Sequence, residues 1–209
     1  YGSILGQESP SIATAYFSSS PKVMVLLRSR HIDSWANLGK KLHKGTWKSS
    51  TLSCKFFEAS PILISELSIP DLGRFMASLD SLSIQSHDLS IECLEVSQKL
   101  LPLLGSSKDS FLSLLEFLCK QNWRQIKGLF EALCSSLPKI GVDQRLAFIN
   151  LVSRLFADGY PNVPSVINNI AASIEQLNET THPAVMELAE KLLDISPPIV
   201  PEFFKSCPT

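Results

Sequence analysis

The side chains that most often carry catalysis or metal binding are scattered along this chain of 209 residues. No two histidines lie three or four positions apart, so no helix could present them as a pair of zinc ligands. No cysteines have Cys-x-x-Cys spacing, and neither a Gly-x-Ser-x-Gly elbow nor a glycine-rich phosphate loop occurs. The residues concerned are His31, His43, His87, His182, Cys54, Cys93, Cys119, Cys134 and Cys207. We therefore expect no catalytic residue, no metal site and no cofactor, and interpret the chain as a non-enzyme.

Two smaller signals have ordinary explanations. The acids Glu187, Glu190 and Asp194 recur at helical spacing, and we interpret them as the solvated face of a helix. A catalytic pair of carboxyl groups would need a cleft and a raised pKa. His182 precedes Pro183 where a helix should start, which favours a capping or exposed position over catalysis.

The best candidate for a binding surface is a lysine-rich segment around a tryptophan: Lys40, Lys41, Lys44, Trp47 and Lys48. Three interpretations stay open. The lysines could simply end a helix, where the helix dipole favours positive charge. They could contact an acidic protein partner. They could also bind nucleic acid, with the lysines on phosphates and the tryptophan stacked on a base.

The charge distribution is uneven. Residues 1–55 hold eight basic and two acidic residues, whereas residues 56–209 hold eleven basic and eighteen acidic ones. The net charge of −1 therefore hides a positive first quarter and a negative remainder. An acidic remainder counts against nucleic acid and favours a protein partner.

An internal repeat organises the chain. Tyr16–Pro21, Phe56–Pro61 and Phe203–Pro208 all read aromatic-aromatic-x-x-x-Pro, and the first two lie 40 residues apart. A second marker is a large apolar residue followed seven positions later by leucine, which places both on one helix face. The pairs are Trp35 with Leu42, Phe75 with Leu82, Phe111 with Leu118, Phe148 with Leu155 and Val185 with Leu192. Their steps of 40, 36, 37 and 37 residues predict one amphipathic helix per repeat.

A second helix should lie between these marker helices in each repeat. We expect these helices near residues 50–67, 88–104, 122–140 and 163–177. At Ser20-Pro21 and Ser60-Pro61 we expect a bend, with the serine as cap and the proline opening a fresh turn. Further helix ends are indicated by glycine in left-handed C-cap positions and by polar N-caps. These are Gly105, Gly141, Gly159, Ser107, Asp143 and Thr181.

These patterns predict an all-α fold, an α-solenoid of about five two-helix repeats of 37–40 residues, in which neighbouring repeats bury each other's apolar faces. The alternative is an ordinary helical bundle. We expect one helical-repeat domain over residues 1–209, cut from a longer protein. No apolar run approaches the roughly 18 residues of a membrane span. An odd, scattered set of cysteines is typical of reduced thiols, so we expect a cytoplasmic protein.

Two family resemblances follow from the first repeats. Trp35-Ala36-Asn37-Leu38-Gly39 is similar to the Trp-x-x-Leu-Gly of tetratricopeptide repeats, although the period here is longer than their roughly 34 residues. The repeat length looks more like HEAT or armadillo units. Trp35, Leu38, Gly39, Phe56–Pro61 and Leu67 together resemble the helical-repeat region of bacterial von Willebrand factor A domain proteins of the CoxE/NorD type.

The CoxE/NorD resemblance implies a role in metalloenzyme maturation with an AAA+ ATPase partner. The metal motif of the A domain, Asp-x-Ser-x-Ser, is missing; the segment Asp88–Glu92 comes closest but lacks the last serine. The chain would then be the repeat region without the metal-binding domain. Our expectation is a non-catalytic protein–protein interaction scaffold, and the alternative is a nucleic-acid-binding HEAT-like solenoid that uses the basic first quarter.

Overall fold

The computed structural model describes residues 9–27, 29–44, 50–177, 179–196 and 199–206. In these ranges the chain forms α-helices joined by short turns and 3-10 segments, and none of these residues lies in a β-strand. The predicted all-α class is therefore confirmed. The chain divides into two compact units, Tyr1–Leu101 with Leu115–Trp123, and Pro102–Leu114 with Arg124–Thr209. A single repeat domain over residues 1–209 stays a prediction.

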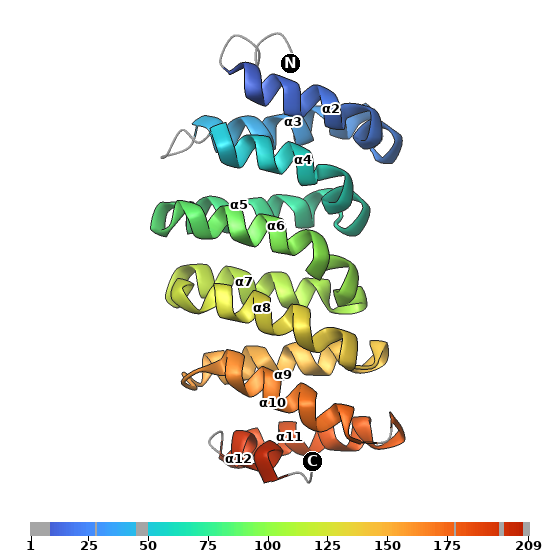
Figure 1. The fold of residues 1–209 in the computed structure, drawn as a ribbon, viewed down its shortest axis with the longest axis vertical. Helices are drawn as coiled ribbons and strands as arrows, with labels where there is room; N and C mark the ends of the chain where they lie inside the picture. Colours follow the sequence, from blue (N-terminus) through green and yellow to red (C-terminus); the bar gives the residue numbers. More distant parts are fainter. Residues whose placement is uncertain (1–8, 28, 45–49, 178, 197–198, 207–209) are drawn as a thin grey trace. The chain divides into compact units, whose positions relative to one another are not determined.

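In the first unit, helices two apart along the chain pack against each other. Its helices are α2 (Pro10–Leu26), α3 (Ser29–Lys44), α4 (Ser50–Glu66), α5 (Ile69–Gln85), most of α6 (His87–Leu104) and the end of α7 (Lys108–Gln121). The helix α4 packs along α2 and also against α3, and α3 packs against α5 (Figure 1). In α2–α5, helices therefore pack both against their neighbour in the chain and against the next helix but one.

The second unit repeats this pattern. It holds α8 (Ile126–Ser136), α9 (Arg145–Ala157), α10 (Val163–Glu175), α11 (His182–Ile195) and α12 (Ile199–Ser206). The helix α10 packs between α8 and α12, while α9 packs against α11 (Figure 1). The 3-10 segments are Gly105–Ser107, Leu137–Lys139, Val142–Gln144 and Glu179–Thr181 here, and Trp123–Gln125 at the boundary of the two units.

The repeat markers lie in the core, as the seven-residue spacing predicts. Trp35, Phe75, Phe111 and Phe148 are fully buried, and the leucine that follows each is buried too. The last pair is the exception, because Val185 and Leu192 are partly exposed. In α11 the buried stripe is instead His182, Met186, Ala189 and Leu193. The true marker there is one residue later, because these four positions, spaced by four, three and four residues, form the inward face.

The predicted serine caps and fresh helix starts at the Ser-Pro steps are wrong. Pro21 lies inside α2 and Pro61 inside α4, and neither serine caps a helix. Instead the Ser60 hydroxyl donates to the Phe56 carbonyl at 2.6 Å, and the Ser20 hydroxyl donates to the Tyr16 carbonyl at the same distance. The N–H missing at Pro21 and Pro61 removes the helical donor of the carbonyls of Phe17 and Phe57, yet both helices continue through the proline.

The other predicted helix ends are only partly correct. Gly105 and Gly159 adopt φ of +55° and +71°, as left-handed C-caps do, whereas Gly141 has a φ of −55°. The Ser107 hydroxyl is buried and donates to the Leu104 carbonyl at 2.6 Å, so it is not a cap. Asp143 lies inside a 3-10 segment, and Thr181 makes no side-chain cap bond.

Candidate functional site

An aromatic cluster fixes the orientation of α3 in the first unit. The indole of Trp35 is fully buried, and its Nε1–H donates to the Ser60 hydroxyl at 2.7 Å. The ring stacks on Tyr16 with centroids 5.0 Å apart and meets the edge of Phe57 at 5.2 Å. Because Trp35 points into this cluster, the opposite face of α3 must point away from it.

A glycine lets α3 and α4 approach closely behind the cluster. A Cβ added to Gly39 would lie 2.2 Å from Cζ of Phe57, so the ring occupies the space that any side chain would need. The Ser53 hydroxyl donates to the Gly39 carbonyl at 2.9 Å and holds the two backbones together. The resemblance of this segment to Trp-x-x-Leu-Gly thus has a local physical basis in ring packing.

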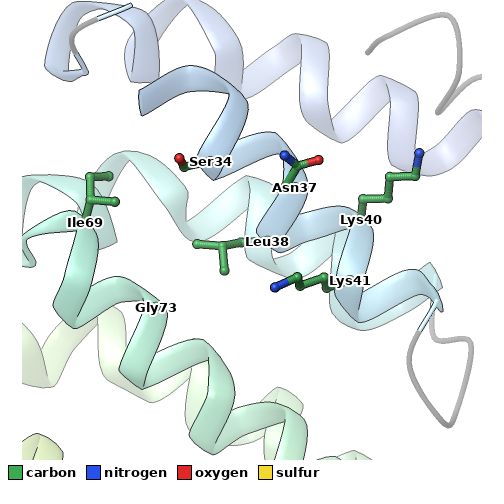
Figure 2. Close-up of a pocket in the computed structure, with 7 residues that line it drawn as sticks. All are labelled: Ser34, Asn37, Leu38, Lys40, Lys41, Ile69 and Gly73. Carbon is green, nitrogen blue, oxygen red and sulfur yellow. The ribbon is translucent and has the colours of Figure 1, made fainter. Parts of the chain in front are cut away.

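The opposite face of α3 lines a groove. Ser34, Asn37, Leu38 and Lys41 follow one another at helical spacing, and α5 supplies Ile69 and Gly73 as the facing wall. The groove has a volume of about 520 Å³ and opens to solvent. Figure 2 shows the residues that line it. A Cβ at Gly73 would meet nothing within 4 Å, so the wall of the groove is open at this position.

A polar cap positions the start of α5 beside this groove. Ser68 precedes the helix, and its hydroxyl accepts from the Asp71 N–H at 3.3 Å while donating to the Asp71 carboxylate at 2.6 Å. Asp71 also lies 3.6 Å from Arg74. The carboxylate of the first turn of α5 is therefore already paired with its own helix and does not neutralise the lysines of α3.

The groove carries positive charge on one wall. Lys40 and Lys41 both line it, and no acidic residue does. Figure 2 shows Lys41 extending from α3 toward α5, while Lys40 points away from that helix. Neither lysine has an ion-pair partner in the part of the chain that the structure describes. The site thus combines the ammonium group of Lys41, with Lys40 at its edge, two exposed polar side chains and an apolar strip of Leu38 and Ile69.

The predicted lysine-rich segment is only partly placed. Lys40 and Lys41 lie in the groove, whereas Trp47 and Lys48 lie outside the described residues and Lys44 only ends α3. Ser34, Asn37 and Leu38 were not predicted as site residues, because the lysines cluster along the chain whereas these three residues share only a helical face with Lys41. The signal was present: these residues precede Lys41 by seven, four and three positions.

A second, smaller hollow lies between α5 and the end of α7. It has a volume of about 240 Å³ and is bordered by Arg74, Glu116 and Cys119. The Arg74 Nε lies 2.8 Å from Glu116, so these two charges of the hollow are already paired. Burial, with a smaller effect of Glu116, raises the pKa of the Cys119 thiol to about 12, and its sulfur donates to the Ser78 carbonyl at 3.4 Å. The thiol is therefore protonated and unreactive at neutral pH.

The remaining candidates for chemistry, the acids and His182, belong to α11. The described residues include no group of three or more His, Cys, Asp or Glu side chains able to hold a metal ion. Glu187 pairs with Lys191 at 2.6 Å, which lowers the pKa of that carboxyl group, and Asp194 pairs with Arg154 at 2.7 Å. Glu187 and Asp194 are exposed, as the sequence predicts for this face, whereas Glu190 is half-buried. His182, expected to cap or be exposed, is buried, with Nε2 3.3 Å from the Leu177 carbonyl.

The four cysteines in the described ranges form no disulfide: Cys93 and Cys119 are buried, and Cys54 and Cys134 are partly exposed. None of the described helices has the length and hydrophobicity needed to cross a bilayer.

Comparison of the chain with protein-family models, with curated proteins and with solved structures finds no match. The resemblances noted above therefore rest on the residues of the first two repeats alone.

Proposed function

We propose that this chain is an α-solenoid of two-helix repeats that works as a protein–protein interaction scaffold, and that the groove between α3 and α5 binds an acidic segment of its partner. Support for the solenoid comes from packing between helices two apart in each unit and from the equivalent burial of the repeat markers. In such folds each repeat contacts mainly its neighbours, and the exposed helix faces form long binding surfaces.

The observation that carries the binding proposal is the composition of the groove. Leu38 and Ile69 provide an apolar strip, while Lys40 and Lys41 provide positive charge without a described acidic partner. A segment with an apolar anchor flanked by carboxylates would match both features. The groove is long enough in one direction to follow a helix, because its α3 wall spans two turns from Ser34 to Lys41.

The same composition favours a protein segment over a nucleic acid as the ligand of the groove. Phosphate binding needs several cations along a strand and gains little from an aliphatic strip such as Leu38 with Ile69. If the resemblance to CoxE/NorD-type proteins reflects a common origin, the partner would be an AAA+ ATPase or the metalloenzyme under maturation. The groove chemistry is independent of that assignment.

A displayed library of random peptides, selected against the full chain, tests the binding proposal without a known partner. We expect the selected peptides to be rich in Asp and Glu around one or two apolar residues. Their affinity should fall about fivefold in Lys41→Ala, since an exposed ion pair contributes up to about 1 kcal/mol. It should also fall when Gly73→Leu fills the open wall of the groove without changing the charge.

The matched control is Lys99→Ala, which removes an exposed lysine from α6 of the same unit and changes the net charge equally. Peptides that bind Lys41→Ala and Lys99→Ala alike would exclude the groove as the site. A gel-shift titration with random DNA at low salt provides the other comparison: retarded DNA that is released by Lys41→Ala would favour nucleic acid over a protein partner.

A further inference from the structure

The first two repeats place the same residue types at the same positions of α2 and α4. The segments Tyr16–Pro21 and Phe56–Pro61 lie 40 residues apart, and each falls in the middle of its helix. Their local geometry is also the same, because Ser20 and Ser60 each donate to the carbonyl four residues back at 2.6 Å. What covers a given position of α4 therefore indicates what its counterpart in α2 is built to receive.

In α4 this face is covered except at Pro61, which is half-buried. Phe57 is fully buried against the rings of Tyr16 and Trp35, and its ring tip lies over Gly39. One turn of helix further along, the Ser60 hydroxyl accepts the Trp35 Nε1–H at 2.7 Å. Ile64, on the same stripe, is only 9% exposed. The cover is thus a helical hairpin, α2 with α3, that brings an indole donor and a glycine to the face of α4.

In α2 the equivalent face is open. Phe17, the counterpart of Phe57, is 58% exposed, and Met24, the counterpart of Ile64, is 57% exposed. Ser20 makes the same donor bond as Ser60, but in the described part of the chain its oxygen accepts no hydrogen bond. Two large apolar side chains and a serine acceptor therefore lie on one face that the described helices leave uncovered.

We propose that this face of α2, formed by Phe17, Ser20, Pro21 and Met24, docks a helical hairpin of the same repeat type. The docked hairpin presents an indole N–H to Ser20 and, four residues later on the same helix, a glycine that makes room for the Phe17 ring. This partner chemistry follows from the α3–α4 contact, in which Trp35 and Gly39 satisfy the equivalent serine acceptor and phenylalanine ring one repeat later. The proposal concerns a different surface from the α3–α5 groove and does not depend on it.

The test inserts a second copy of residues 10–49 between Ser9 and Pro10 of the full chain, so that the natural junctions are kept. The methionine of the inserted copy is replaced by leucine, which leaves Met24 as the only reporter of the face. Oxidation by hydrogen peroxide, followed by peptide mapping, measures how accessible each methionine is. Met76 and Met186, which are 2% and 1% exposed, serve as protected internal references.

We expect Met24 to oxidise roughly sixfold more slowly in the extended chain, which is about the ratio of its 57% exposure to the 9% of Ile64. The protection should disappear when the tryptophan and the glycine of the inserted copy are replaced by alanine and valine. Val25, 85% exposed and equivalent to the exposed Ser65, provides the control: Val25→Ala should leave the protection unchanged.

Two results would overturn the proposal. One is an unchanged oxidation rate of Met24 in the extended chain. This result counts against the proposal even if circular dichroism shows no added helix, because docking on α2 should itself fold the inserted residues. The other is protection that survives loss of the inserted tryptophan and glycine, which would mean that any added segment covers the face. Lys41→Ala, which tests the groove, should not alter the protection, so the two proposals fail separately.

Discussion

Gly39 offers a sharp test of how α3 and α4 pack, because alanine at this position would have two effects on stability that oppose each other. Gly39 lies in the middle of α3, where replacing glycine with alanine normally stabilises a helix by about 1 kcal/mol. Here, however, the new Cβ would lie 2.2 Å from Cζ of Phe57 and 2.7 Å from the two neighbouring ring carbons. We expect the clash to outweigh the gain.

The size of the loss depends on whether the Phe57 ring can move away. That ring is fully buried and is held by Tyr16, Trp35 and Phe56, with centroids 5.4, 5.2 and 5.4 Å away. Overpacking a tight core costs about 1–3 kcal/mol, and losing the packing of a buried phenylalanine costs about 3–5 kcal/mol. After the helix gain is subtracted, we expect Gly39→Ala to be less stable than the wild-type chain by about 2 kcal/mol.

The structure supplies a matched control. Gly73 is also inside a helix, but a Cβ there would meet nothing within 4 Å, so Gly73→Ala should stabilise by about 0.5–1 kcal/mol. Urea unfolding followed by far-UV circular dichroism measures both variants. Adding Phe57→Leu to Gly39→Ala should restore part of the loss, because the smaller side chain leaves room for the methyl group. Similar stabilisation by Gly39→Ala and Gly73→Ala would refute the packing described here.

Three further outcomes are expected. Trp35→Phe should lower the free energy of unfolding by about 2 kcal/mol in urea, since it removes the hydrogen bond to Ser60 and leaves a small cavity. Because the pKa of Cys119 rises from 9.0 to about 12 on folding, its contribution to stability is complete below pH 9 and is lost as the pH rises toward 12. Between pH 8 and pH 10, the free energy of unfolding in urea should therefore fall less in Cys119→Ala than in the wild-type chain. Lys191→Ala should leave the melting temperature unchanged by calorimetry, because its ion pair with Glu187 is fully exposed. A steeper loss with pH in Cys119→Ala, or a clear fall in the melting temperature of Lys191→Ala, would contradict these interpretations.

Helix positions were the most predictable feature of the sequence. The second helices expected at residues 50–67, 88–104 and 163–177 occur at Ser50–Glu66, His87–Leu104 and Val163–Glu175. Amphipathic spacing fixes such elements locally, since each helix must turn one apolar stripe inward. The segment expected at 122–140 is interrupted, with α8 between two 3-10 turns. Pro138 lies in the second turn, where its missing N–H helps to end the helix.

The errors came from features that depend on tertiary contacts. A Ser-Pro pair signals a helix start when it is read locally, yet Ser60 also serves as the acceptor for Trp35, a residue 25 positions away. That contact and the burial around Phe57 hold the helix continuous through Pro61. In α11, likewise, the inward face is set by packing against α9 and α12, and the seven-residue marker alone places it one residue too early.

The candidate site was only half predictable for the same reason. Lys40 and Lys41 could be predicted because they belong to a cluster of lysines that is visible along the sequence. The apolar strip of Leu38 and Ile69 joins residues from two helices, and no spacing within one helix brings them together. At Gly73 the sequence shows only a glycine inside a helix. That pattern does not reveal whether the space beside the glycine is empty or filled.

The measurement that addresses the proposed function most directly is an NMR titration of the ¹⁵N-labelled chain with an acidic peptide selected from the library. If the groove binds such segments, the amide signals of Asn37, Leu38 and Gly73 should shift and saturate together, and the shifts should weaken in Lys41→Ala and at high salt. Signals of α8–α12 should stay in place. Saturating shifts that spare α3 and α5, or that persist unchanged in Lys41→Ala, would contradict the assignment of this groove as the partner-binding site.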